Sequence, residues 1–180
     1  NWKRPKKEIN YLFSLLQTFL IERINNGEVS NFLYDISTEG DNFQVSNPIG
    51  KRFILQNKKI PIFVASGSGI APFISMSKYL ANKNKRFYMY HWSKNFSGLV
   101  IYEENKSYIN SFYFPNITRN KPPNWTGGDS RINSKTFNNL DLNNQYEFYV
   151  CGSDFFVENA LDIISNLGKK FDIYTERFGS

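Results

Sequence analysis

Short apolar segments that alternate with segments of helical periodicity dominate the chain from residue 60 onward. The first is the apolar run Ile60–Ser66, which ends at Gly67-Ser68-Gly69. An apolar run of this length that ends in glycines predicts a buried strand. Pro72 suits the first turn of a following helix, because its missing N–H is not needed there. Strands that alternate with helices in this way predict an α/β fold with a parallel sheet covered on both faces.

The same alternation continues to the end of the sequence. Further strands are expected over 86–91, 111–118, 145–151 and 171–178, with helices after Pro72, over 100–109, and from Ser153 or Asp154 to Gly168. The segment 119–131 is rich in proline and glycine and predicts a loop. We assign residues 59–180 to this domain.

Residues 1–58 have a different pattern. Apolar segments over 19–24, 41–46 and 52–56 predict strands, and glycines separate them. This pattern is typical of an antiparallel sheet or barrel, so we expect a partial antiparallel β-barrel over residues 1–58.

Composition limits the classes of partner. Lys and Arg total 22 against 16 Asp and Glu, a formal charge of +6 that favours an acidic protein or an anionic ligand. The basic residues are scattered apart from an N-terminal run, so nucleic-acid binding is not expected. No apolar run approaches the roughly 18 residues of a membrane span, and no signal-peptide pattern opens the chain.

Cysteine and histidine each occur once. Cys151 cannot form an internal disulfide, which favours a reducing, cytoplasmic setting. With His91 as the single histidine, no metal site is expected.

Gly67-Ser68-Gly69 leads from a predicted strand directly into a predicted helix. Free N–H groups and the positive end of the helix dipole favour phosphate at such a place. The dinucleotide fingerprint G-x-G-x-x-G has its last glycine where Pro72 stands. The segment is therefore either a different phosphate loop or a structural strand-to-helix turn.

Other candidate residues follow the predicted strands. Ligands bind at the carboxyl ends of parallel strands, so Cys151 and Ser68 should face one crevice. The alternative for Cys151 is a small buried apolar residue. Arg119 and Arg131 suit bidentate phosphate capture, or are solvated surface charges. Glu176 by itself reads as a surface acid in an ion pair.

Five ordered motifs resemble those of the ferredoxin–NADP reductase superfamily. Three are GSGIAPF at 67–73, YVCGS at 149–153 and ERF at 176–178. Upstream, Gly27–Leu33 is similar to the flavin-phosphate segment G-x-V-S-x-x-L, and Asn47–Phe53 to the turn G-P-x-G-x-F. The resemblance implies a flavin-binding antiparallel barrel followed by a nicotinamide-dinucleotide domain.

The resemblance also implies which residues bind the nicotinamide dinucleotide. Gly67, Ser68 and Gly69 would hold it, with Gly152 and Ser153 beside them. Arg119 and Arg131 resemble the 2′-phosphate binders of the family, which favours NADPH over NADH. Cys151 would lie near the nicotinamide ring where hydride leaves, Glu176 would help poise the ring or relay protons, and Phe178 would pack near the isoalloxazine.

For the flavin, the resemblance implies that Ser30 contacts the phosphate, with Val29 and Asn31 beside it. The nearest match to the family motif R-x-Y-S is Tyr11-Leu12-Phe13-Ser14, with Tyr11 in place of the arginine. It implies Tyr11 and Phe13 as flavin-binding residues and Ser14 as the serine near flavin N5. FAD is the expected flavin, with FMN as the alternative.

The sequence therefore predicts a flavin-dependent NAD(P)H oxidoreductase that passes electrons from NADPH through FAD to an acceptor. The positive charge favours an acidic acceptor such as a ferredoxin or flavodoxin, or a fused redox partner. One alternative is a nucleotide-binding regulatory or interaction module that has lost flavin, which Tyr11 favours. Another is a basic scaffold or RNA-binding domain.

Overall fold

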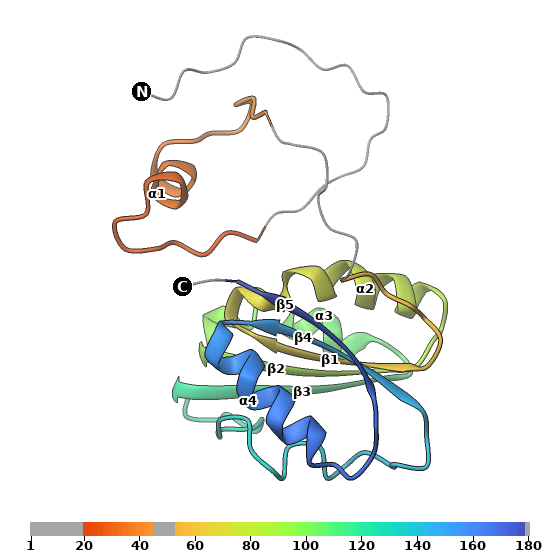
Figure 1. Ribbon diagram of the computed structural model, residues 1–180. Helices are drawn as coiled ribbons and strands as arrows, with labels where there is room; N and C mark the ends of the chain where they lie inside the picture. The colour runs from red at the N-terminus through yellow and green to blue at the C-terminus, as the bar shows by residue number, and fades with distance from the viewer. Residues whose placement is uncertain (1–19, 45–52, 179–180) are drawn as a thin grey trace. The chain divides into compact units, whose positions relative to one another are not determined.

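The computed structural model describes residues 20–44 and 53–178, and the chain divides into two compact units, Asn1–Lys51 and Arg52–Ser180. The described part of the first unit contains one helix, α1 (Glu28–Asp35). The second unit is built around a five-stranded sheet (Figure 1).

All strands of the second unit run parallel, in the order β3-β2-β1-β4-β5. The strands are β1 (Ile60–Ser66), β2 (Phe87–Asn95), β3 (Ser111–Asn120), β4 (Tyr146–Gly152) and β5 (Asp172–Arg177). The helices are α2 (Ala71–Asn82), α3 (Tyr102–Ser107) and α4 (Asp154–Ser165), with short 3-10 helices η1 (Gly67–Ile70) and η2 (Phe96–Gly98). The predicted parallel α/β sheet is confirmed. β2 and β3 extend beyond their predicted ends because their pairing continues to Asn95 and Asn120.

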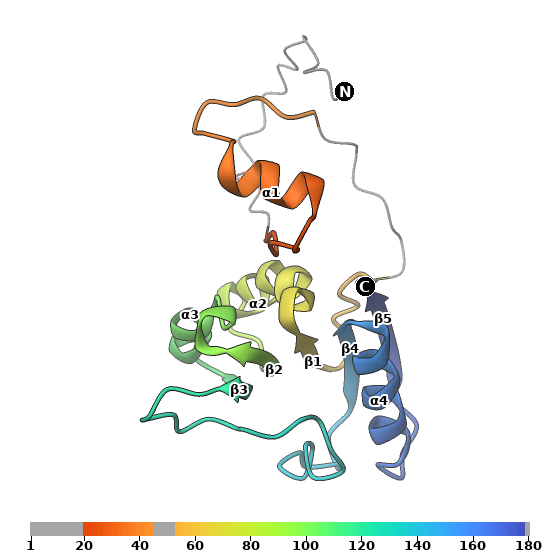
Figure 2. The same cartoon turned by 90° about the vertical axis from the view of Figure 1, so that its left-hand side faces the viewer.

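Helices cover both faces of this sheet. Figure 2 shows α2 and α3 on one face, and α4 with the long connection from β3 to β4 on the other. Side chains alternate between the faces: Phe63 of β1 stacks on Phe73 of α2, whereas Phe148 of β4 packs against Phe137 of the connection. Because both faces are covered, the interior strand β4 is buried along its whole length.

The chain changes direction across the sheet between β1 and β4. β1 continues into α2 on one face, and β4 continues into α4 on the opposite face. The two connections therefore diverge at the carboxyl ends of β1 and β4, the switch point at which open α/β sheets bind ligands.

The strands predicted in the N-terminal part are wrong where the structure describes them. Residues 20–24, 41–44 and 53–56 are not strands. A strand needs a neighbour to accept its backbone hydrogen bonds, and residues 20–44 contain no other strand. Instead, Gly27 begins α1, and Glu28 in its first turn is favoured by the helix dipole. The described residues of the first unit thus contain a helix and show no barrel.

Among the described residues, no helix combines the length and the apolar character needed to cross a membrane.

Candidate functional site

The turn from β1 to α2 lies at the carboxyl edge of the sheet. Gly67 has a φ of 56°, a left-handed conformation that glycine adopts without strain. Pro72 lies in the first turn of α2, and no side chain caps this helix. The first N–H groups of a helix have no partner within it, so those of η1 are available to a ligand. At the start of α2, by contrast, the Ala71 amide donates to the Ser68 carbonyl, and Pro72 has no N–H.

Gly69 brings this turn into contact with the end of β4. A Cβ atom on Gly69 would lie 2.6 Å from the carbonyl carbon of Cys151 and 2.8 Å from the amide nitrogen of Gly152, and closer still to the Cys151 carbonyl oxygen. No side chain fits in that space. The two glycine motifs, which are far apart in the sequence, therefore meet backbone to backbone at the β1–β4 switch point.

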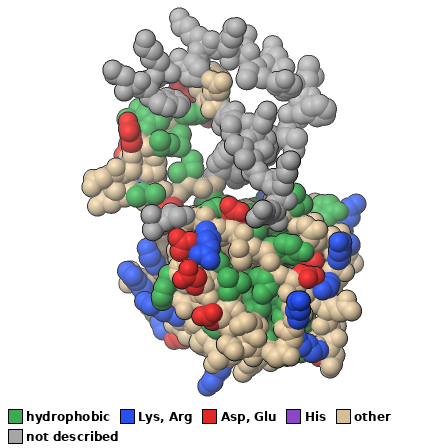
Figure 3. All heavy atoms as spheres, viewed as in Figure 1, with side chains coloured by type: hydrophobic (Ala, Val, Ile, Leu, Met, Phe, Trp, Pro, Cys, Tyr) green, Lys and Arg blue, Asp and Glu red, His purple; other side chains and the backbone are tan. Residues whose placement is uncertain are grey.

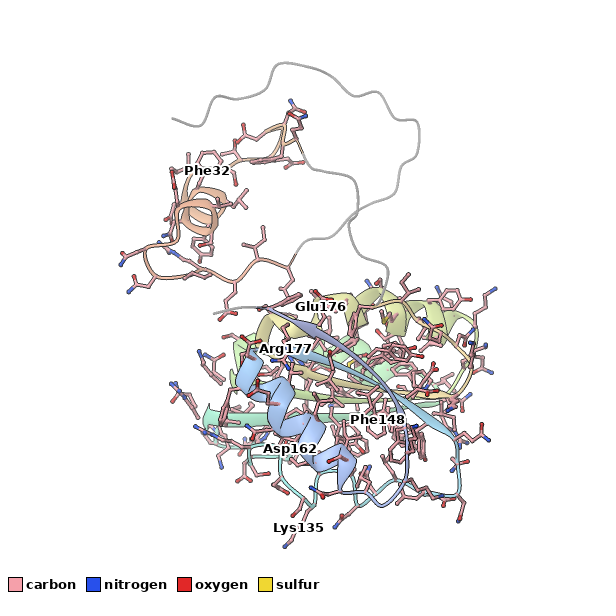
Figure 4. All side chains as sticks on the ribbon, in the orientation of Figure 1. Phe32, Lys135, Phe148, Asp162, Glu176 and Arg177 are labelled. Carbon is pink, nitrogen blue, oxygen red and sulfur yellow. The ribbon has the colours of Figure 1, made fainter. Side chains whose placement is uncertain are left out.

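β5 adds its end to the same edge. Cys151 pairs with Glu176 and Gly152 with Arg177, and the amide of Phe178 donates a hydrogen bond to the Gly152 carbonyl at 3.0 Å. Figure 4 shows Glu176 and Arg177 at this end of β5. Three of the segments singled out in the sequence thus converge at one place.

Cys151 is fully buried and is a neutral thiol at physiological pH. Burial, with a smaller contribution from the negative charge of Glu176, raises the pKa of its thiol to about 12. A thiol with this pKa is a poor nucleophile. Cys151 can shape an apolar wall, whereas Glu176 and Phe178 are exposed at the end of β5.

The two helix N-termini at this edge differ in charge. Arg177 forms ion pairs with Asp154 and Glu158 of α4, each at 3.2 Å. Figure 3 shows acidic side chains gathered near this end of α4. The first turn of α2 carries no acidic residue. An anion is therefore favoured at α2, because Asp154 already occupies the positive end of the α4 dipole.

Ser153 stands at the N-cap position of α4, as predicted, but its side chain makes no capping hydrogen bond. Its exposed hydroxyl is free to bind a ligand beside Gly152. Ser153 thus occupies the N-cap position that the sequence predicted, but the capping hydrogen bond is not formed.

Arg119 and Arg131 are exposed, and each follows a residue held by the carboxyl half of β2. The Thr118 hydroxyl donates to the Ser93 carbonyl at 3.2 Å, and the indole Nε1 of Trp92 donates to the Ser130 carbonyl at 3.0 Å. Two consecutive residues of β2 therefore anchor the segments that carry the two arginines.

The flavin residues predicted in the first unit lie partly on α1. Ser30 is buried, and its hydroxyl accepts a hydrogen bond from the Ile24 amide at 3.2 Å. Asn31 accepts one from Arg23 at 2.8 Å, whereas Val29 is exposed. The backbone amides of Val29 and Ser30 lie in the first turn of α1, where a phosphate is favoured, although Glu28 beside them opposes an anion. Tyr11, Phe13 and Ser14 lie outside the described residues.

His91 is a residue that the sequence did not connect with this site. It is fully buried on β2 beside Ala65 of β1, and its Nδ1 lies 3.2 Å from the Tyr113 hydroxyl. Burial lowers the pKa of its imidazole to about 4, and the backbone of Gly67 partly opposes this shift. A neutral imidazole thus lies buried near the turn at Gly67, and its Nε2 has no hydrogen-bond partner among the described residues. Only the register of β1 and β2 reveals that proximity.

Over residues 20–44 and 53–178, no group of His, Cys, Asp or Glu side chains could hold a metal ion.

Comparisons with known proteins agree with this geometry. The family described as "Oxidoreductase NAD-binding domain" matches residues 63–162, which include the Gly67 turn and the Cys151 end of β4. Protein RfbI of Salmonella typhimurium is 24% identical over 143 residues, 77% of this chain and 43% of its own. A flavohemoprotein of Bacillus subtilis is 28% identical over 166 residues, 86% of this chain and 41% of its own. The chain thus spans less than half the length of either relative.

Solved structures that share the fold over most of the chain include the flavohem-like FAD/NAD-binding domain of a nitric oxide dioxygenase from Vibrio cholerae. The TM-score is 0.73 at 20% identity, over 86% of this chain and 65% of that one.

Replacement of Gly69 by alanine tests the backbone contact. The added methyl group must displace the Cys151 and Gly152 backbone, so Gly69→Ala should lower the free energy of unfolding by about 1–3 kcal/mol. It should also weaken binding of the expected nicotinamide coenzyme more than tenfold. Urea denaturation and calorimetric titration measure the two effects.

Gly168→Ala is the matched control. Gly168 has a φ of 75° and no atom within 4 Å of the position of a Cβ. An alanine there therefore introduces backbone strain alone, away from the β1–β4 switch point. Coenzyme binding should not change in this variant. If the Gly69→Ala variant bound the coenzyme as tightly as the wild type does, this would contradict the assigned contact.

The buried histidine predicts a specific pH dependence. The pKa of His91 is about 4 in the folded protein against 6.5 ordinarily, so between these values the unfolded chain binds a proton that the folded protein does not. The contribution of neutral His91 to the free energy of unfolding is fully present above pH 6.5. Below that pH, the free energy of unfolding falls by up to about 1.4 kcal/mol per pH unit. The carboxyl pKa values of Asp129 and Asp172 are lowered by Lys121 and Lys59, so both carboxyls titrate below this window.

Urea denaturation of the wild type and of His91→Gln at pH 7, 6 and 5 measures this dependence. The variant should lose the slope between pH 6.5 and 5. Equal slopes in the two proteins would assign the pH dependence to other groups.

Proposed function

Since the chain belongs to the oxidoreductase NAD-binding domain family, we propose that it is the reductase part of an enzyme that takes electrons from NADPH and passes them through FAD to an acceptor. The resemblance to the ferredoxin–NADP reductase superfamily is confirmed by this family membership and by the shared fold. The activity, the flavin and the acceptor are our proposal.

The observation that carries the proposal is the convergence of three segments at the β1–β4 switch point. Gly69 lies against the backbone of Cys151 and Gly152, and Phe178 is hydrogen-bonded to Gly152. A turn with glycine on both sides of Ser68 suits a diphosphate, because its backbone N–H groups can approach the ligand closely. A buried thiol beside that turn suits an uncharged ring.

We assign the coenzyme to the residues at this edge. Gly67, Ser68 and Gly69 would hold the diphosphate together with the first turn of α2, which carries no acidic residue. Gly152 and Ser153 would line the opposite side of the β1–β4 switch point, where the Ser153 hydroxyl is not used in a cap. Arg119 and Arg131 would bind the 2′-phosphate, and for this reason we propose NADPH over NADH.

Cys151, Glu176 and Phe178 would surround the reacting end of the coenzyme. The thiol of Cys151 stays protonated, so its role is to exclude water and to fix the position of the ring. Glu176 is exposed and adjacent to Cys151, where its carboxylate can hold or move a proton. A bound flavin supplies acceptance of a hydride and release of electrons one at a time.

We further propose residues 1–58 as the flavin-binding part of the chain and residues 59–180 as the coenzyme domain. The first turn of α1, with Val29, Ser30 and Asn31, fits a flavin phosphate through its backbone N–H groups. FAD is the proposed flavin, with FMN as the alternative. Tyr11, Phe13 and Ser14 complete the proposed flavin site from sequence resemblance alone.

The acceptor is proposed to be an acidic protein or a fused redox domain. The formal charge of +6 favours an acidic partner. The name of the flavohemoprotein relative supports a haem acceptor as one form of that partner. A cytoplasmic setting belongs to the same proposal, because Cys151 is the single cysteine of the chain.

An absorbance spectrum between about 350 and 500 nm tests the function, because bound flavin absorbs there and loses that absorbance when reduced. The protein is measured after incubation with FAD and again, without oxygen, after addition of NADPH. We expect flavin bands that bleach. Failure to retain flavin would instead support a coenzyme-binding module without redox chemistry.

Arg119→Ala tests the coenzyme preference. Loss of a charged hydrogen bond to the 2′-phosphate should weaken NADPH binding by about 10- to 100-fold and leave NADH within about twofold. Arg86→Ala is the matched control, since Arg86 is also exposed but precedes β2 at the opposite edge of the sheet. Equal losses for both coenzymes would remove Arg119 from 2′-phosphate binding.

A further inference from the structure

His91 lies beside the turn that leads from β1 into α2. In the register of the sheet it pairs with Ala65, two residues before Gly67. Met89 pairs with Phe63, which stacks on α2, so His91 two residues later points to the same face of the sheet. The turn itself, η1, contacts β2 as well as β1 and β4. Because His91 is 0% exposed, it can act on a ligand only through this turn.

The two nitrogens of the His91 imidazole have different surroundings. Nδ1 lies 3.2 Å from the Tyr113 hydroxyl of β3. Burial raises the pKa of Tyr113, so its hydroxyl keeps its proton and can donate it to Nδ1. The single proton of a neutral imidazole then lies on Nε2. Nε2 is buried without a hydrogen-bond partner among the described residues. A buried N–H group costs free energy until an acceptor reaches it.

The Gly67 carbonyl is the acceptor that the turn offers to Nε2. Burial lowers the pKa of His91 to about 4, and the Gly67 backbone opposes this shift. A carbonyl oxygen near the ring has that effect and a backbone N–H has the opposite one. Since Nδ1 faces Tyr113, Nε2 is the nitrogen left for this oxygen. The C=O and N–H groups of a trans peptide point in opposite directions, so a Gly67 carbonyl bound to His91 directs the Ser68 N–H away from the imidazole.

We propose that His91 is a positioning residue of the coenzyme site: its Nε2–H binds the Gly67 carbonyl when the coenzyme occupies the turn, and this holds the Ser68 N–H toward the diphosphate. Tyr113 keeps the imidazole in the tautomer that this bond needs. The coenzyme part of the inference rests on the proposed function. The tautomer does not, and it is measured without coenzyme or flavin.

Nitrogen-15 resonance of the imidazole tests the tautomer in the full chain, purified without a histidine tag. His91 is the single histidine, so its two ring-nitrogen signals are assigned without ambiguity. At pH 7 we expect a proton on Nε2 and none on Nδ1. Tyr113→Phe should mix the two tautomers, because the hydroxyl that binds Nδ1 is gone. A proton on Nδ1 in the wild type would overturn the proposal.

Tyr90→Phe is the matched control for Tyr113→Phe. It also removes the hydrogen bond of a tyrosine hydroxyl within the sheet, to Asn139 at 2.7 Å, but on the other face. The Nε2 tautomer should persist in this control. Equal mixing of the tautomers in the two variants would overturn the role of Tyr113.

Titration with NADP+ tests the hydrogen bond to the turn. The Nε2–H signal should move downfield, because an acceptor deshields the proton, and should saturate together with the Gly67 and Ser68 amide signals. An Nε2–H signal that stays fixed while those amides shift would overturn the proposal. Absence of every shift would overturn the proposed coenzyme site, and the coenzyme role of His91 with it. The tautomer result in the free protein is independent of that outcome.

Two substitutions separate the hydrogen bond from packing. His91→Gln keeps an N–H donor near the place of Nε2, so NADP+ binding should stay within about twofold of the wild type. His91→Leu keeps the bulk without a donor and should weaken binding about 5- to 10-fold, the effect of one net hydrogen bond. Calorimetric titration measures both affinities. Equal affinities in the two variants would assign His91 to packing and overturn the proposal.

Tyr113→Phe gives the same test with the histidine in place, should His91→Leu fail to fold. Loss of the fixed tautomer should weaken NADP+ binding about 2- to 5-fold, whereas Tyr90→Phe should bind as the wild type does. Wild-type affinity in Tyr113→Phe together with a mixed tautomer would overturn the positioning role.

Discussion

At the carboxyl edge of the sheet, backbone meets backbone with no side chain between. Gly69 lies so close to the Cys151 carbonyl and the Gly152 amide that a single methyl group does not fit. This contact brings the η1 turn onto the end of β4, and the hydrogen bond from Phe178 to Gly152 then adds β5. The residues assigned to the reacting end of the coenzyme are near one another because this approach is possible.

The distribution of charge follows the same geometry. The interior of the site is uncharged, since the Cys151 thiol and the His91 imidazole are both held neutral by burial. The charged candidate residues Arg119, Arg131 and Glu176 are exposed. A buried uncharged wall suits a ring, and exposed charged side chains suit phosphates.

Local sequence signals predicted the second unit well and the first unit poorly. Apolar runs bounded by glycines located β1 and β4, because a strand covered on both faces needs a continuous apolar segment. The strand predicted over 41–46 is absent at 41–44, which have no partner strand among the described residues. The helix Glu28–Asp35 overlaps the motif Gly27–Leu33, which predicts flavin binding but gave no prediction of a helix. The contacts of Glu147 with Asn57, and of Tyr149 with Gln56, join residues about 90 positions apart, which no local pattern reveals.

Nuclear magnetic resonance provides the most direct test that this edge of the sheet binds the coenzyme. The full chain, labelled with nitrogen-15, is titrated with NADP+ and the backbone amide shifts are followed. The largest, saturable shifts should occur at Gly67–Gly69, Gly152 and Ser153, with smaller ones at Arg119 and Arg131. Shifts confined to other parts of the sheet, or none at millimolar NADP+, would contradict the assignment of this site.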